Sequence, residues 1–65
     1  MDLREAMELR AQLLRDMASD NLRGQRKFRD CLSGPGREMG DWYEGRYEAY
    51  KKAAEMITDT LEMCA

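Results

Sequence analysis

Residues 42–50 combine one arginine with four aromatic side chains, and binding chemistry is most concentrated there. Arg46 lies within about one helical turn of Trp42, Tyr43, Tyr47 and Tyr50. A guanidinium beside aromatic faces can stack on a base or grip a phosphate, and the same residue types dominate protein–protein hot spots. We expect Tyr43 and Tyr50 in a packed core with their hydroxyls at its rim. The seam is the stripe of side chains that one helix turns toward the other. Trp42 and Tyr47 then lie off the seam, on its two opposite sides or shoulders, where they are available to a second copy, a protein partner or a ligand.

A second concentration of charge is a basic run that contains Arg23, Arg26, Lys27 and Arg29. Such a run suits an anion or a phosphate backbone. It also suits a solvated surface whose positive charge complements the C-terminal dipole of a helix. We favour the solvated surface, because the four cations point in several directions around a helix. The alternative is a composite site, formed with the aromatic cluster, for a nucleotide or a nucleic acid.

Residue types that carry catalysis are scarce in the chain. It has no histidine and two cysteines, which excludes histidine acid–base chemistry and a cysteine–histidine zinc site within one chain. The carboxylates are spread at helical spacing and match neither a di-iron nor a calcium-loop pattern. We therefore predict no enzymatic activity, no metal and no cofactor.

Size and composition indicate one small domain. The chain has 65 residues, of which 43% are hydrophobic and 37% charged, with a net charge of −2. No apolar run is long enough to cross a bilayer, and the first residues show no basic region followed by an apolar one. The expectation is a cytoplasmic protein without membrane contact, in which Cys31 and Cys64 are reduced.

Two amphipathic helices account for almost the whole sequence. Apolar residues recur at alternating spacings of four and three, which predicts helices over about 3–32 and 37–63, with a loop at 33–36. Ser33-Gly34-Pro35-Gly36 is the strongest punctuation, and the second helix can begin at Pro35 or, through a capping box, at Asp41. Gly24 does not break the first helix, because the apolar phase continues past it.

A short loop between two long helices predicts an antiparallel hairpin. Residues whose numbers sum to about 70 then face each other, so Phe28 meets Tyr43 and Gly24 meets Arg46 or a tyrosine ring. The polar residues of the two seams would fix the register, as they do in coiled coils; these residues are Arg10, Asn21, Arg46 and Thr60. In this register Cys31 and Cys64 lie at opposite ends of the hairpin, out of disulfide reach.

One hairpin cannot cover all of its apolar side chains. The fold expected is therefore all-α, an antiparallel two-helix hairpin that dimerises into a four-helix bundle. The residues expected at the dimer interface are Leu9, Leu13, Leu22, Met56 and Leu61.

Two resemblances bear on function. The layout is similar to the small helical-hairpin dimers exemplified by the plasmid RNA-binding regulator Rop, without a shared motif. The stretch Trp-Tyr-Glu-Gly-Arg-Tyr-Glu-Ala-Tyr at 42–50 resembles helices of small bacteriophage accessory proteins. That resemblance implies a compact factor that binds and modulates a host component, and it assigns no site residue.

These observations predict a non-enzymatic interaction module that binds and modulates a protein partner, as a bacteriophage-encoded inhibitor of a host factor would. Its contact residues are expected near the loop, in the basic run and around Trp42, Tyr43, Arg46 and Tyr47. Two alternatives stay open. One is sequestration of a nucleotide or phosphate ligand, or nucleic-acid binding, through the same arginines and aromatics. The other is a purely structural oligomer.

Overall fold

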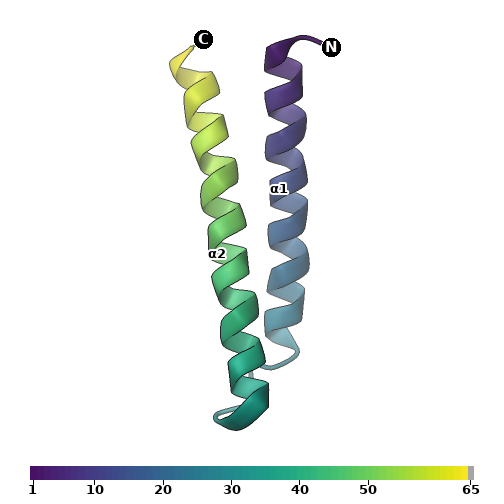
Figure 1. Cartoon of the computed structure of the whole chain (residues 1–65), viewed down its shortest axis with the longest axis vertical. Coiled ribbons are helices and arrows are strands. Elements are labelled where there is room, and N and C mark those ends of the chain that lie inside the picture. The colour runs from purple at the N-terminus through teal and green to yellow at the C-terminus, as the bar shows by residue number, and fades with distance from the viewer. Residues whose placement is uncertain (65) are drawn as a thin grey trace.

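The computed structural model describes residues 1–64 and contains two helices, α1 (Leu3–Arg26) and α2 (Gly34–Met63). The helices lie side by side and run in opposite directions, so that the start of α1 and the end of α2 lie at one end and the connection closes the other (Figure 1). We call these ends the open end and the loop end. The predicted all-α hairpin is confirmed. Neither helix is long and apolar enough to span a membrane within the part of the chain described.

Helix α1 begins where Asp2 accepts a hydrogen bond from the Glu5 amide at 2.8 Å, a side-chain N-cap. It continues through Gly24 without interruption, as the apolar phase predicts. It ends at Arg26, earlier than the predicted residue 32, which corrects that boundary. Beyond Arg26 the amides of Phe28 and Cys31 bond to carbonyls three residues back, at 3.0 Å each. These tighter turns replace the α-helix and begin the reversal of the chain.

Helix α2 begins earlier than the predicted residue 37. Gly34 has a φ of +76°, a left-handed conformation in which glycine is favoured, and Pro35 lies in the first turn. The start near Pro35 is therefore the correct one of the two predicted, and Asp41 lies inside the helix. The Ser33 side chain makes no capping hydrogen bond. Helix α2 thus starts on backbone geometry rather than on a side-chain cap.

The buried residues between the helices are mostly small. Ala11, Ala18 and Ala54 are 2–5% exposed, Leu14 is 8% exposed, and no large side chain is fully buried among the described residues. Alanines at a helix–helix contact let the two backbones approach closely. The contact line of α1 therefore passes through Met7, Ala11, Leu14, Ala18 and Asn21, and that of α2 through Tyr43, Tyr47, Tyr50, Ala54, Ile57 and Leu61.

This contact line corrects the predicted seams. Arg10 and Thr60, expected in the seams, are exposed, whereas Ala11, Ala18 and Ala54 are buried. Each predicted seam is rotated from the observed line by roughly 50° about its helix axis, at 3.6 residues per turn. The physical reason is that an apolar stripe is centred on its large side chains, whereas the closest approach of the helices is at the small ones.

The hairpin is a single layer of helices. Its principal extents are 46 × 19 × 12 Å, and its radius of gyration is 14.9 Å. A compact chain of this length would have a radius of gyration of about 11 Å. The chain is therefore more extended than a compact domain of its size.

Candidate interaction surfaces

The two broad faces of the layer differ in polarity. Successive residues of a helix lie about 100° apart, and the apolar stripe of each helix lies to one side of its contact line. Because the two helices are antiparallel, both stripes face the same broad side of the layer. We call it the apolar face; it comprises Leu3, Leu13, Met17, Met39, Trp42, Ala49, Ala53 and Met56. Five of its large side chains are 40–78% exposed, namely Leu3, Leu13, Met39, Trp42 and Met56. At the same spacing the exposed residues Arg10, Arg46 and Thr60 also fall on this face. So many exposed large apolar side chains on one face are unusual for an isolated soluble chain.

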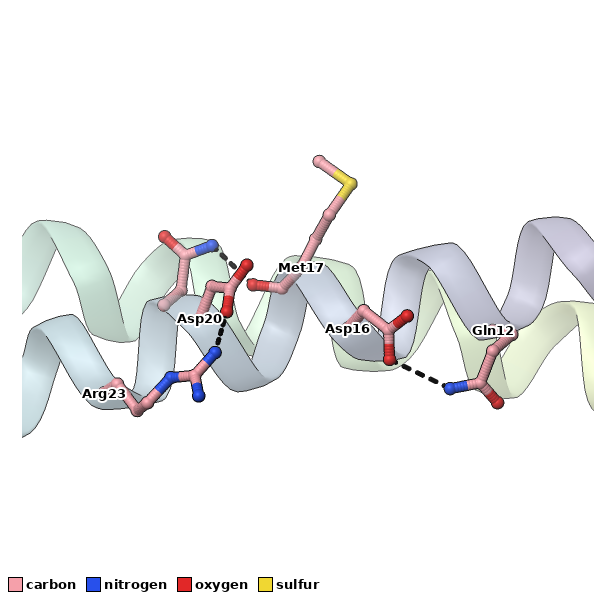
Figure 2. Close-up of polar contacts among 6 residues, drawn as sticks. Gln12, Asp16, Met17, Asp20 and Arg23 are labelled. Atoms are coloured by element: carbon pink, nitrogen blue, oxygen red, sulfur yellow. Dashed lines mark hydrogen bonds and ion pairs between the residues drawn. The ribbon is translucent and has the colours of Figure 1, made fainter.

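The opposite broad face is polar. Arg15 donates a hydrogen bond of 2.6 Å to Thr58 across the helices on that side. The other residues of this face are mainly charged, and they include Glu8, Arg26, Arg37, Glu44, Lys51 and Glu55. The outer edge of α1 is polar too: Figure 2 shows Gln12 bonded to Asp16 and Asp20 paired with Arg23, while the Met17 side chain extends away from both ribbons. Along the two helices the exposed apolar side chains therefore gather mainly on one face, whereas Leu32 is exposed at the loop end.

Arg46 is held at the edge of the apolar face by contacts with both helices. Its Nε donates to the Asn21 side-chain oxygen at 3.1 Å, and Nη2 donates to the Tyr50 hydroxyl at 2.8 Å. Its guanidinium carbon lies 4.7 Å from the Trp42 ring centroid and 5.2 Å from that of Tyr50. Both distances are within cation–π range. These contacts fix the guanidinium between two aromatic rings one turn before and one turn after it.

Asn21 is the buried residue that orients Arg46. Its side chain is among the least exposed polar groups, at 9%, and its Nδ2 donates to the Met17 carbonyl at 2.7 Å. Its oxygen is thereby left facing Arg46. Asn21 and Arg46, two of the polar residues predicted to fix the register, thus join α1 to α2 through one polar contact.

Arg46 has no acidic partner within the described chain. The ion pairs among residues 1–64 are Arg4–Glu8, Asp20–Arg23 and Arg37–Asp41, and all of them are exposed. A guanidinium has five N–H donors, and the contacts with Asn21 and Tyr50 use two of them. The remaining donors of Arg46 are available to a carboxylate or another anion that approaches the apolar face.

Gly24 makes room for Tyr43 rather than for Arg46. A Cβ atom at Gly24 would lie 2.5 Å from the Tyr43 Cε1 atom. The Tyr43 ring stacks on Phe28 with centroids 6.1 Å apart, and Trp42 meets its edge at 4.9 Å. Of the two residues that the sequence placed opposite Gly24, the tyrosine is therefore the correct one, and the Phe28–Tyr43 pairing is confirmed.

Tyr47 does not lie on an exposed shoulder. It is half-buried and lines a groove on the polar side of the contact line together with Ala18 and Ala54, and Lys51 lies 5.7 Å above its ring. The off-seam position predicted for Tyr47 is therefore wrong. The off-seam position of Trp42, which is 52% exposed, is confirmed.

The basic run is divided between two surroundings. Arg23 pairs with Asp20 at the outer edge, and Lys27 caps the end of α1. Arg26 and Arg29 line a groove of about 390 Å³ at the loop end, which we call the loop groove; its other lining residues are Leu22, Gln25, Phe28, Cys31, Leu32, Arg37, Gly40, Asp41 and Glu44. Trp42 and Arg46 do not line this groove. The predicted composite of basic run and aromatic cluster is therefore two separate sites.

The residues predicted for a dimer interface are also spread over the molecule. Leu13 and Met56 lie on the apolar face, and Leu9 lies at its margin, 56% exposed. Leu22 instead lines the loop groove, and Leu61 is half-buried along α2. The prediction from sequence missed five residues of this face, which are Leu3, Met17, Met39, Ala49 and Ala53. The signal was present, because residues 42, 49, 53 and 56 share one side of a helix.

No protein-family model matches the chain, and neither the characterised proteins nor the solved structures with which it was compared give a match.

Proposed function

We propose that this protein is a non-enzymatic interaction module, which dimerises through its apolar face into a four-helix bundle and binds a protein partner at its loop end. The observation that carries the proposal is the displacement of both apolar stripes from the helix contact toward the same broad face. A hairpin selected to be a monomer would gain by centring those stripes on the contact between its own helices. An uncovered apolar face instead favours association with another helical layer.

The exposed area supports this proposal. The accessible surface is 5073 Å². A compact monomer of 7.6 kDa would expose about 4,300 Å². The excess of roughly 800 Å² is about the area that one partner contributes to a standard protein–protein interface. A second copy with the same apolar face is the simplest surface that covers it.

Sedimentation velocity over a range of concentrations tests the dimer. A charge at Leu13 would have to be buried in the proposed interface, so Leu13→Lys is expected to raise the dissociation constant at least tenfold. Leu32→Lys is the matched control, because Leu32 is 82% exposed at the loop end and lies off the apolar face. A wild-type chain that stays monomeric at every concentration would contradict the proposal. Equal effects of the two substitutions would contradict the assignment of the interface.

The loop groove is the surface proposed for the protein partner. Arg26 and Arg29 line it beside Phe28 and Leu22, and neither arginine belongs to an ion pair among the described residues. Arg37 and Asp41 of the lining pair with each other, which leaves these two arginines and Glu44 beside the apolar side chains. A lining with more cations than carboxylates suits an acidic segment that carries an apolar anchor. The resemblance of residues 42–50 to bacteriophage accessory proteins favours a host protein as the source of that segment.

Affinity capture from a bacterial lysate tests the partner site. We expect wild type to retain a defined protein, and the double variant Arg26→Glu/Arg29→Glu to lose it. The variant Arg4→Glu/Arg15→Glu makes the same charge change away from the groove and is expected to retain the partner. Loss of the partner with both variants, or with neither, would contradict the loop groove as its site.

Anion binding at Arg46 is the second candidate function. The observation that favours it is the guanidinium held between Trp42 and Tyr50 with unused donors. Titration calorimetry with inorganic phosphate, nucleoside monophosphates and short RNA tests it. The expected signal is lost in Arg46→Met and weakens with salt. Absence of heat with every probe at low salt would eliminate this candidate.

A further inference from the structure

The charge of the hairpin is distributed unevenly along its length. Residues 1–10 and 55–64, at the open end, carry six carboxylates and two arginines. Residues 21–40, an equal length of chain at the loop end, carry five cations and two carboxylates. The open end is therefore acidic and the loop end basic, although the whole chain is only slightly negative.

Two symmetric arrangements would bring the apolar faces of two copies together. If the twofold axis runs along the helices, both loops lie at the same end of the bundle. If the axis runs across the helices, the loop of each copy lies at the open end of the other. In both arrangements each helix faces an antiparallel neighbour, so the helix dipoles do not distinguish them.

The charge distribution does distinguish them. With the axis along the helices, two acidic open ends are adjacent and two basic loop ends are adjacent. With the axis across the helices, each acidic end is adjacent to a basic end. Neighbouring ends in a bundle lie within about one Debye length at 0.1 M salt, so this difference is felt in solution. Opposed like charges are a strong device against a wrong orientation.

We propose that the two copies are related by a twofold axis that runs across the helices, so that the basic loop end of each chain lies against the acidic open end of its partner. This inference rests on the proposed function, because it requires that the apolar face be the dimer interface. It specifies the occupant of that face as an identical chain related by a twofold axis, with its loop end at the open end of the first chain. It also leaves one loop groove at each end of the bundle, so that two partner sites are separated by the full length of the dimer.

The two cysteines are placed to test the orientation. Both are free thiols; Cys31 lies at the loop end and Cys64 is exposed at the open end. In Cys31→Ser a spin label is attached to Cys64, and in Cys64→Ser it is attached to Cys31. The distance between the two labels of a dimer is then measured by pulsed electron resonance for each variant. If the twofold axis runs across the helices, the two labels of each dimer lie at opposite ends, roughly 40 Å apart at a rise of 1.5 Å per residue. Along the helices, both labels would share an end and give short distances.

The outcomes separate this inference from the proposed function. Long distances in both label positions support the arrangement with the twofold axis across the helices. Short distances in a sample that sediments as a dimer overturn the orientation and leave the dimer intact. A sample that sediments as a monomer and gives no interchain distance overturns the proposed function, and this inference with it.

A charge variant gives a second test. Lys27→Glu/Arg29→Glu makes the loop end acidic and is expected to lower the fraction of long distances at least twofold at low salt. Lys51→Glu/Lys52→Glu changes the charge equally near the middle of α2 and is expected to leave the distance distribution unchanged. A loop-end variant with the wild-type distribution would show that charge does not set the orientation.

Discussion

Gly24 lies under the ring of Tyr43, and this contact decides what an alanine would do there. Alanine gains about 1 kcal/mol of helix propensity over glycine. At Gly24 its Cβ would lie 2.5 Å from the Tyr43 ring, which is confined by Phe28 and Trp42. Overpacking of this kind costs about 1–3 kcal/mol. We therefore expect Gly24→Ala to lower the free energy of unfolding by about 1 kcal/mol in denaturant titrations.

Gly45 provides the matched control for that prediction. It lies in α2, and a Cβ there would meet nothing within 4 Å. Gly45→Ala should therefore show the propensity gain alone, an increase of about 1 kcal/mol. Both variants must be compared with wild type at one protein concentration, because self-association contributes to apparent stability. Stabilisation by both alanines would mean that Tyr43 moves aside at no cost.

Asn21 and Arg46 should act as an energetically coupled pair. Replacing Arg46 with methionine removes the donor and leaves the buried Asn21 oxygen without its bond across the helices. An unsatisfied buried acceptor costs about 1–3 kcal/mol. In an Asn21→Ala background that acceptor is gone, so the same substitution should cost less. A double-mutant cycle in urea is expected to give a coupling energy of about 1 kcal/mol. Additive effects would mean that the hydrogen bond is not formed in solution.

At the scale of the helix, the start of α1 depends on one side chain. Asp2 Oδ1 accepts from the Glu5 amide at 2.8 Å. Asp2→Ala should lower the free energy of unfolding by about 1 kcal/mol, whereas Asp2→Asn keeps the cap and should cost only a few tenths. Thermal unfolding followed by circular dichroism compares the two. If the asparagine variant is as unstable as the alanine variant, charge at the helix dipole rather than the cap is responsible.

The two helices could be predicted from the sequence, but the rotation of each helix about its own axis could not. The four–three spacing and the punctuation at Ser33–Gly36 predict a hairpin, and Gly24 inside α1 is consistent with an unbroken phase. Apolar periodicity, however, locates large side chains. Ala11, Ala18 and Ala54 set the contact by their small size, and this is why Tyr47 and Arg10 were misplaced.

The end of α1 and the surroundings of Arg46 could also be predicted only in part. Over a single turn, spacings of three and 3.6 residues cannot be separated, so the tight turns at 27–31 resembled more α-helix. The cluster of Arg46 with Trp42 and Tyr50 was accessible, because these residues are four apart on one helix. Their relation to Asn21 followed from the approximate register of the hairpin. The separation of the basic run from this cluster depends on which broad face each residue occupies, and that required the rotation.

At the scale of the whole molecule, the hairpin has the dimensions of half a bundle. It is 12 Å thick in its shortest direction, about the diameter of one helix, and three of its six buried residues are alanines. A core of that kind provides little of the apolar burial that stabilises small domains. Covering the apolar face would bury Leu13, Trp42 and Met56, so folding and association are expected to be coupled, with a melting temperature that rises with protein concentration.

Trp42 makes that coupling measurable, because it is the single tryptophan of the chain and lies 52% exposed on the apolar face. If two apolar faces pack together, its indole moves from water into an apolar contact. The emission maximum should therefore shift to shorter wavelength as the concentration rises, and acrylamide quenching should fall at least twofold over the range in which sedimentation detects dimers. In Leu13→Lys, emission and quenching should stay at their dilute values. A dimer that forms with unchanged Trp42 emission and quenching would place the interface elsewhere, and the apolar face would then remain free for a different partner.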